Sequence, residues 1–268
     1  MYKLNAYHIL QKLKFEIHIT DHCNLNCIGC NHFSPLADNF YLELTDYERD
    51  CKRLYELTNG EIEEIVLLGG EPLLHPNLQN IFYITSQYFQ TAKIILLTNG
   101  ILLASQEDDF WESCHKYGIH ILITKYPIYI NYETIIEKAN RFNVKCSYGI
   151  NRNSEIKKME CIPINPNNQM SAESCFNQCY KANNCITLRN GKLYTCCTIP
   201  FAPYLKKHFN LPIDISPNNG IDIYKTNNIE EILTFLSKPV AFCKYCDFEH
   251  RREDIPWGIS KKELDEWT

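Results

Sequence analysis

Residues 15–30 read FEIHITDHCNLNCIGC, an apolar stretch that is followed at once by Cys23, Cys27 and Cys30. The alternation of apolar and polar residues before the cysteines predicts a β-strand. The cysteines then lie in the loop at its carboxyl end, where parallel α/β folds place their chemistry. Three thiolates at this spacing can bind three irons of a [4Fe-4S] cube and leave the fourth iron without a protein ligand.

This spacing matters for function because it leaves the fourth iron free to bind another molecule. An open iron can bind the amino and carboxylate groups of S-adenosylmethionine (SAM), and an electron from the reduced cluster then breaks the sulfonium C–S bond. Zinc is the alternative, but a structural zinc site needs four protein ligands. His22 or His32 could supply the fourth.

The sequence around the cysteines predicts repeated β-α units around a parallel sheet, from residue 15 to about residue 148. Thr45 and Glu48 form a capping-box pattern, and Asn59-Gly60 is a helix stop. The class is therefore α/β. We expect strands at 15–20, 62–68, 93–97, 119–123 and 144–148, with helices at 45–57, after Pro76, between Ser105 and Gly118, and at 132–142.

Beyond Gly149 the pattern changes to Asn- and Pro-rich sequence such as residues 162–168. Such composition suits a boundary, so we divide the chain into residues 1–150 and 151–268. In the second part, Asn190-Gly191 between two apolar runs predicts a β-hairpin. Ser260 and Glu263 form a capping-box pattern that predicts a final helix.

The loops after the second, third and fourth expected strands supply candidates for SAM contacts, because these strand ends meet on one rim. Paired glycines let a backbone segment approach a ligand closely, and a carboxylate can accept a hydrogen bond from an ammonium group. The candidates are Gly69, Gly70, Glu71 and Pro72, then Thr98 and Asn99, then Thr124 and Lys125. We expect Lys125 to pair with the SAM carboxylate and His32 to touch the substrate.

The cysteine spacing C-x3-C-x2-C and the segment Gly69-Gly70-Glu71-Pro72 resemble the radical SAM superfamily over roughly residues 13–150. The resemblance implies a partial (β/α)6 TIM-like barrel, SAM cleavage to a 5′-deoxyadenosyl radical, and hydrogen abstraction from a substrate. It makes the three cysteines the cluster ligands, and Gly69, Gly70 and Glu71 the methionine-binding segment. Ile28 stands where the family usually has an aromatic residue, which alters the expected packing beside the adenine.

A second cysteine set follows in the tail. Four thiolates there could close a further [4Fe-4S] cluster or a zinc site. The spacing resembles the twitch form of the SPASM auxiliary-cluster region, which implies a small C-terminal cysteine-rich domain. Cys175 and Cys185 leave the choice of the first ligand open. The favoured set is Cys179, Cys196, Cys243 and Cys246.

The amino-acid composition limits the cellular compartments and the kinds of partner that we expect for this protein. Fourteen cysteines in 268 residues are too many for a reducing compartment unless they bind metal, and a disulfide framework would require secretion. The net charge of −5 offers no basic field, so we expect no nucleic acid partner. The sequence shows no apolar run of about 20 residues and no signal peptide, so we expect a cytoplasmic protein.

The functional expectation is an enzyme that dehydrogenates or epimerises a small polar substrate, namely a sugar, aminocyclitol or nucleotide-sugar. A single auxiliary cluster and a compact length resemble the 2-deoxy-scyllo-inosamine dehydrogenase type. A radical SAM peptide maturase is the first alternative; only 22 residues precede Cys23, too few for a winged-helix peptide-recognition domain. A non-catalytic iron–sulfur or zinc protein is the second. The expected electron donor is a flavodoxin or ferredoxin.

Overall fold

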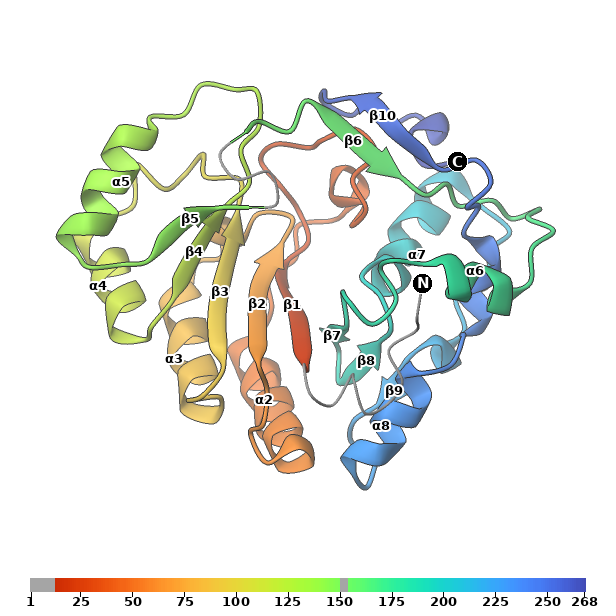
Figure 1. The fold of residues 1–268 in the computed structure, drawn as a ribbon, viewed down its shortest axis with the longest axis horizontal. Helices are drawn as coiled ribbons and strands as arrows, with labels where there is room; N and C mark the ends of the chain where they lie inside the picture. The colour runs from red at the N-terminus through yellow and green to blue at the C-terminus, as the bar shows by residue number, and fades with distance from the viewer. Residues whose placement is uncertain (1–12, 150–153) are drawn as a thin grey trace.

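One long sheet organises the computed structural model, which describes residues 13–149 and 154–268. Its eight strands follow the order β5-β4-β3-β2-β1-β7-β8-β9, and β10 pairs separately with β6 (Figure 1). The strands are β1 (Lys14–Thr20), β2 (Glu64–Gly69), β3 (Lys93–Thr98), β4 (His120–Ile123), β5 (Cys146–Tyr148), β6 (Lys158–Cys161), β7 (Thr187–Arg189), β8 (Lys192–Tyr194), β9 (Ile221–Asp222) and β10 (Arg252–Pro256).

The first half alternates strands with helices. Strands β1 to β5 pair in parallel in succession, and β7 pairs in parallel with the other edge of β1. The helices that link β1 to β5 lie outside the curve of the sheet (Figure 1), as the predicted partial barrel requires. The helices are α2 (Leu44–Thr58), α3 (Leu78–Tyr88), α4 (Asp108–Lys116), α5 (Tyr132–Arg141), α6 (Ala172–Gln178), α7 (Thr198–Phe209) and α8 (Ile229–Leu236).

Strand β1 divides its side chains between two environments, as a strand with alternating character must. Phe15, Ile17 and Ile19 are buried in the main core with residues of the outer helices. Glu16 and His18 alternate with them and face the interior of the barrel, where Glu16 lines a cavity. The central strand therefore carries both the core and part of the site.

The predicted hairpin is confirmed and extends the main sheet. Asn190 and Gly191 have φ angles of 49° and 68°, the left-handed values that a two-residue hairpin turn needs. Because β7 pairs with β1, strands from both sides of residue 150 belong to one sheet. The division of the chain into two domains at that residue stays a prediction.

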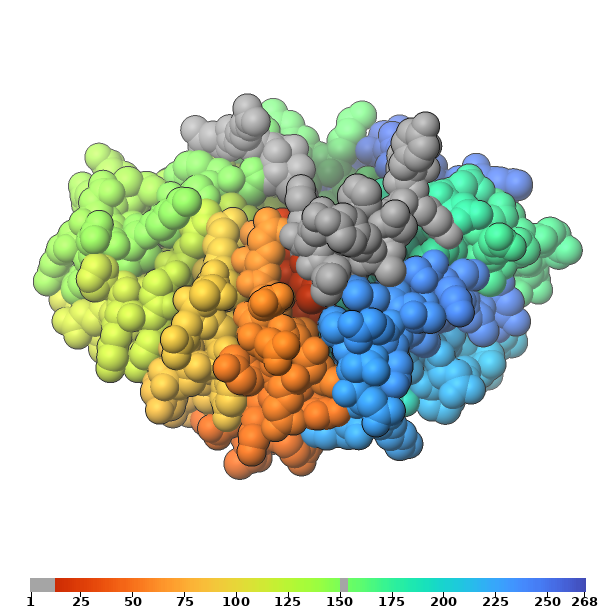
Figure 2. All heavy atoms as spheres, turned by 60° about the horizontal axis from the view of Figure 1, so that its bottom comes forward, coloured from red at the N-terminus to blue at the C-terminus, as the bar shows by residue number. Residues whose placement is uncertain are grey.

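The base of the barrel is closed by contacts between α2 and the segment that leads into α8. These elements lie side by side on the face shown in Figure 2. Arg53 donates to the carbonyl oxygens of Ile223 at 2.9 Å and Thr226 at 2.6 Å. Asp50 accepts the backbone N–H of Gly191 at 3.0 Å, so α2 also holds the hairpin turn.

Two predicted capping boxes are wrong. Helix α2 begins at Leu44 with Glu43 as its N-cap, which places Thr45 inside the first turn, where its hydroxyl cannot cap. The final helix is absent from the described tail; a short 3-10 turn (Leu264–Glu266) forms there, with its own capping box between Glu263 and Glu266. Ser260 instead gives its backbone N–H to the carbonyl of Asn26 at 2.8 Å, which draws the tail onto the cysteine loop.

Membrane insertion receives no support from the helices. Across the two described ranges, no helix has both the length and the apolar character that a bilayer crossing requires.

Candidate active site

A cavity of about 500 Å³ opens where β1 to β4 end. Its wall combines the loop of Cys23, Cys27 and Cys30 with the residues that follow β2, β3 and β4. Strand β6 and the residues around Lys181 form the opposite side. The three cysteines therefore share one chamber with the predicted rim loops.

The cysteine loop holds its sulfur atoms with polar contacts. Trp257 donates its indole N–H to Cys27 Sγ at 3.2 Å, and the backbone N–H of Leu25 points to Cys23 Sγ at 3.4 Å. Asn99 extends its amide toward Cys23 Sγ at 3.8 Å. Burial raises the pKa of the Cys23 thiol to about 11 and that of Cys27 to about 12. Binding of a metal cluster must therefore release protons from them.

The chain tail covers this loop. Asn26 and Gly29 take left-handed φ angles of 50° and 61°, which turn the loop tightly. The backbone N–H of Ile28 then bonds the carbonyl of Gly258 at 2.9 Å. Trp267 donates its indole N–H to the carbonyl of Cys30 at 3.0 Å. The tail in which we expected a final helix thus packs against the cysteine loop.

Gly69 and Gly70 allow a close approach of main chains. A Cβ on Gly69 would lie 2.2 Å from the carbonyl oxygen of Thr20, and one on Gly70 would lie 2.0 Å from that of His22. Both glycines also line the cavity. Their missing side chains let β2 press against the segment that enters the cysteine loop.

Glu71 joins the ends of β2 and β3. Its side chain is buried and accepts the backbone N–H of Leu73 at 3.1 Å, the Thr98 hydroxyl at 2.6 Å and the backbone N–H of Asn99 at 3.0 Å. Burial raises the pKa of this carboxyl to about 7, against the effect of these hydrogen bonds. Pro72, the first residue of the following 3-10 turn, is buried beside it.

The remaining predicted contacts separate into two groups. His32, Thr98, Asn99 and Thr124 line the cavity. Lys125 is absent from the described lining, and its Nζ lies 4.5 Å and 4.9 Å from the ring centroids of two tyrosines, Tyr132 and Tyr148. The structure therefore does not bring Lys125 to the chamber that holds the other candidates.

The four tail cysteines also come together. Cys179, Cys196, Cys243 and Cys246 line one small cavity beside the main one. Cys196 and Cys246 have pKa values well above the ordinary thiol value, first because of burial and then because of the neighbouring thiols. Cys175 lines the same cavity, but its thiol donates to the Cys246 carbonyl at 3.2 Å. Cys185 lines the main cavity instead.

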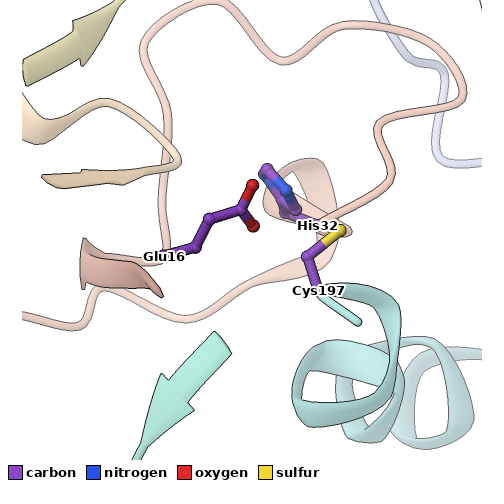
Figure 3. A group of neighbouring side chains, drawn as sticks. All are labelled: Glu16, His32 and Cys197. Carbon is purple, nitrogen blue, oxygen red and sulfur yellow. The ribbon is translucent and has the colours of Figure 1, made fainter. Parts of the chain in front are cut away.

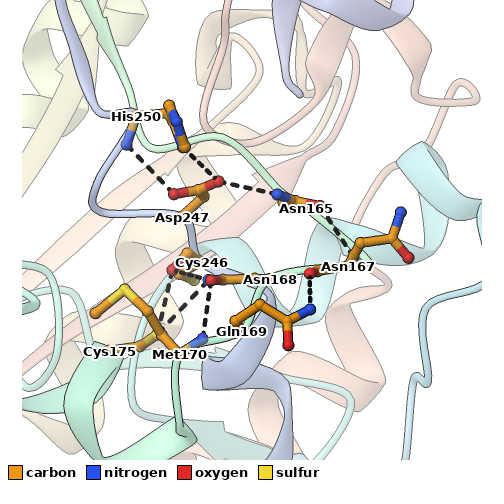
Figure 4. A network of polar contacts seen from close by, with 9 residues as sticks. All are labelled: Asn165, Asn167, Asn168, Gln169, Met170, Cys175, Cys246, Asp247 and His250. Atoms are coloured by element: carbon orange, nitrogen blue, oxygen red, sulfur yellow. Dashed lines mark hydrogen bonds and ion pairs between the residues drawn. The ribbon is translucent and has the colours of Figure 1, made fainter.

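A network of asparagines supports the turn that carries Cys243 and Cys246 (Figure 4). Asn168 donates to the carbonyl of Cys246 at 2.9 Å. Asn165 donates to Asp247 at 2.9 Å, and that carboxylate also contacts His250 Nδ1 at 2.9 Å. The Asn-rich segment 162–168, which we interpreted as a boundary, therefore stabilises the turn that carries two cysteines of the second set.

The distances between ligand atoms indicate which side chains could bind a single metal ion. A tetrahedral zinc site with Zn–S bonds of 2.3 Å places its sulfur atoms about 3.8 Å apart. Among the described residues, the one group of three or more ligand side chains whose donor atoms all lie within 4.8 Å is Glu16, His32 and Cys197. Neither cysteine set meets that limit.

Several contacts within the site could not be predicted from the sequence. Glu16 and Cys197 lie with His32 (Figure 3). Tyr126 lines the cavity, and its ring centroid is 5.8 Å from that of Trp257. Glu16 had a detectable signal, since a charged residue in the middle of a central strand is uncommon. The contact of Trp257 with Cys27 had no local signal, because the two residues are 230 positions apart.

Known proteins resemble this chain in sequence. Residues 17–127 match the model of the Radical SAM superfamily. GTP 3′,8-cyclase of Synechocystis sp. is 30% identical over 165 residues, which cover 60% of this chain and 46% of that protein. GTP 3′,8-cyclase of Clostridium botulinum (strain Okra) is 24% identical over 256 residues, 86% of this chain and 74% of that protein. The chain thus spans less than half the length of the Synechocystis relative.

A solved structure shares the fold. The crystal structure of BtrN in complex with AdoMet and 2-DOIA has a TM-score of 0.55 with this chain and covers 92% of it. The match includes 94% of the BtrN chain at 17% sequence identity. At that identity the likeness shows the fold alone, and it extends through both the barrel and the cysteine-rich tail.

Proposed function

Because the chain carries a radical SAM domain over residues 17–127, we propose that it is an enzyme in which Cys23, Cys27 and Cys30 hold the [4Fe-4S] cluster. The cofactors of this domain are that cluster and SAM. When bound, they supply a 5′-deoxyadenosyl radical, which abstracts hydrogen from a substrate in the cavity. The observation that carries the proposal is the placement of the three thiols on one wall of the 500 Å³ chamber.

The rim residues would hold SAM against that wall. Asn99 contacts both the cysteine loop, through Asn24 Oδ1 at 2.8 Å, and the carboxylate of Glu71. Thr98 and Thr124 face the same space. In this proposal Glu71 fixes two strand ends in register, and the main chain of 69–71 presents its polar groups to the methionine part of SAM.

The second cysteine set would hold an auxiliary [4Fe-4S] cluster through Cys179, Cys196, Cys243 and Cys246. Cys196 faces that set, while the next residue, Cys197, lines the main cavity. Two consecutive residues therefore line the two cavities. An auxiliary cluster held by these four residues would supply a one-electron acceptor close to the main cavity, which supports a dehydrogenation.

The charges in the cavity favour a small polar substrate. Among the described lining residues, Lys158 and Lys181 face three carboxyl groups, those of Glu16, Glu71 and Glu160. This balance gives no excess of cations for a triphosphate. A sugar, an aminocyclitol or the sugar part of a nucleotide-sugar fits it better.

A substrate screen tests this ranking. The full chain would be reconstituted anaerobically and incubated with SAM, a reductant and three panels: sugars and aminocyclitols, GTP, and precursor peptides. Liquid chromatography with mass spectrometry should show, in the first panel, a product that has lost two hydrogens or a product of unchanged mass with a different retention time. Conversion of GTP would favour the chemistry named for the sequence relatives, and a modified peptide with unchanged sugars would favour a maturase. Either result would overturn the proposed substrate class.

The proposed partners follow from the same chemistry. Reduction of the cluster needs a low-potential one-electron donor, and we infer a flavodoxin or a ferredoxin in the cytoplasm. Replacing the chemical reductant by each purified carrier and its reductase would check this step.

A further inference from the structure

Three side chains from distant parts of the chain meet inside the barrel, apart from both cysteine sets. Glu16 comes from β1, His32 follows the cysteine loop, and Cys197 is the residue just before α7 (Figure 3). One donor atom from each lies within 4.8 Å of the other two. All three residues line the main cavity.

The Glu16 carboxyl group lies near the Cys185 thiol and the Lys181 ammonium, but one of its oxygens has no hydrogen-bond partner. Its Oε2 atom is buried and forms no hydrogen bond. An orphaned buried carboxylate oxygen costs free energy unless an ion, a water or a ligand satisfies it. Because Glu16 lines the main cavity together with His32 and Cys197, an ion or ligand in that cavity can reach this oxygen.

The imidazole is positioned by its neighbours. The ring of His18, buried on the same face of β1 as Glu16, packs edge-on against His32 with centroids 4.4 Å apart. The ring centroid of Phe201 lies 4.2 Å from that of His18 and 6.0 Å from that of His32. The next residue to His32, Asn31, is fixed by the Lys181 ammonium at 2.8 Å. These contacts limit the orientations that His32 can take.

We propose that Glu16, His32 and Cys197 bind a single divalent transition-metal ion, with Zn²⁺ as the best match. A thiolate, an imidazole and a carboxylate are the ligand types that zinc accepts together, and their charges neutralise the ion. Three protein ligands with the cavity on the fourth side give an open, catalytic type of site. The open position would take an oxygen ligand: water, or a hydroxyl group of the substrate if the proposed function holds.

This ion is distinct from the two clusters. Cys196 and Cys197 are consecutive residues, but the first faces the four-cysteine cavity and also belongs to its set, while the second faces the main cavity. Cys185 lies close to both Glu16 and Cys197 without joining the group of three. Because its ligand atoms would be one sulfur, one nitrogen and one oxygen, the ion would have a coordination shell that differs from that of a cluster.

The test is zinc binding by the full chain after both clusters have been reconstituted. Protein equilibrated with Zn²⁺ and then freed of excess metal should hold about one zinc per chain by mass spectrometry. X-ray absorption at the zinc edge should show one sulfur and otherwise nitrogen and oxygen neighbours. Glu16→Gln and Cys197→Ser should each weaken zinc binding at least tenfold.

Matched variants serve as controls. Glu160→Gln removes another carboxylate of the cavity, and Cys146→Ser removes a thiol of β5, so both should bind zinc as the parent chain does. If Cys197→Ser loses its iron, Glu16→Gln with intact iron decides the question. Less than one-tenth zinc per chain, a shell of four sulfurs, or unchanged binding by both ligand variants would overturn the proposal.

Iron, sulfide and SAM cleavage are measured on the same samples. An iron-loaded chain that cleaves SAM but takes up no zinc would refute this site and leave the proposed function intact. A chain that binds zinc through the three ligands without cleaving SAM would refute the proposed function alone.

Discussion

At the scale of single residues, the Glu71 side chain links the end of β2 to the end of β3. One carboxylate oxygen accepts from Leu73 and Thr98, and the other from Asn99. In Glu71→Gln the amide nitrogen must face one of these donors, which leaves a buried N–H without an acceptor. We expect the free energy of unfolding to fall by about 1–3 kcal/mol at neutral pH, measured by urea unfolding of the full chain. An unchanged midpoint would contradict this role.

The same carboxyl group gives a pH dependence. Burial raises its pKa from 4.5 to about 7, so the folded chain binds more protons than the unfolded chain between these values. The free energy of unfolding therefore decreases as the pH rises through this window. Glutamine does not titrate, so the loss caused by Glu71→Gln should be larger at pH 5 than at pH 8, by roughly 2 kcal/mol. Equal losses at both pH values would argue against the buried carboxyl.

Trp257 gives a second prediction at this scale. Its indole N–H bonds Cys27 Sγ, and a hydrogen bond to a ligand sulfur stabilises the reduced state of an iron–sulfur cluster. Trp257→Phe should therefore shift the midpoint potential of the SAM-binding cluster to more negative values, on the order of tens of millivolts. An EPR-monitored redox titration measures the shift. Trp267→Phe is the control, because that indole bonds the carbonyl of Cys30; equal shifts in both would contradict the assignment.

At the scale of elements, the ends of β1 and β2 must approach closely for the site to form. A methyl group on Gly70 would lie 2.0 Å from the backbone oxygen of His22, and the chain there cannot move without displacing the cysteine loop. Gly70→Ala should lower the free energy of unfolding by about 3 kcal/mol or more and reduce iron uptake. Gly258→Ala, with open space around its Cβ, should retain both properties. Normal iron content in Gly70→Ala would show that cluster binding does not need the close contact between the ends of β1 and β2.

The elements of the first half could be predicted because their signals are local. The run before Cys23 alternates within a single strand, and Asn59-Gly60 ends α2 with two left-handed residues. The tail could not be predicted in this way. Ser260 pairs with Asn26, far along the chain, and this contact outweighs the local helix pattern. Strands β6 and β10, which pair with each other, were missed for the same reason.

At the scale of the whole molecule, each cysteine set contains a short local motif that can be read in the sequence, whereas the choice of Cys179 and Cys196 rested on the family resemblance. The group of Glu16, His32 and Cys197 could not be read in this way, since three separate elements meet to form it. The parallel pairing of β7 with β1 brings the tail against the barrel. This pairing was outside the reach of local patterns, although the hairpin itself was predicted.

The same architecture predicts a division of labour between the sets. Cys243→Ala should spare the SAM-binding cluster, whose proposed ligands line the main cavity, and therefore preserve SAM cleavage while substrate turnover falls. Cys27→Ala should remove a ligand of the first cluster and stop both reactions. Separate assays of 5′-deoxyadenosine and of modified substrate distinguish the variants. Identical behaviour of the two would refute the division.

The most direct measurement is 5′-deoxyadenosine formation by the full chain, reconstituted without oxygen and supplied with SAM and a strong reductant. The account predicts that the parent chain forms this product together with methionine, and that Cys27→Ala forms none. An iron-loaded parent chain that leaves SAM intact, with its cluster held by four side chains, would contradict the account.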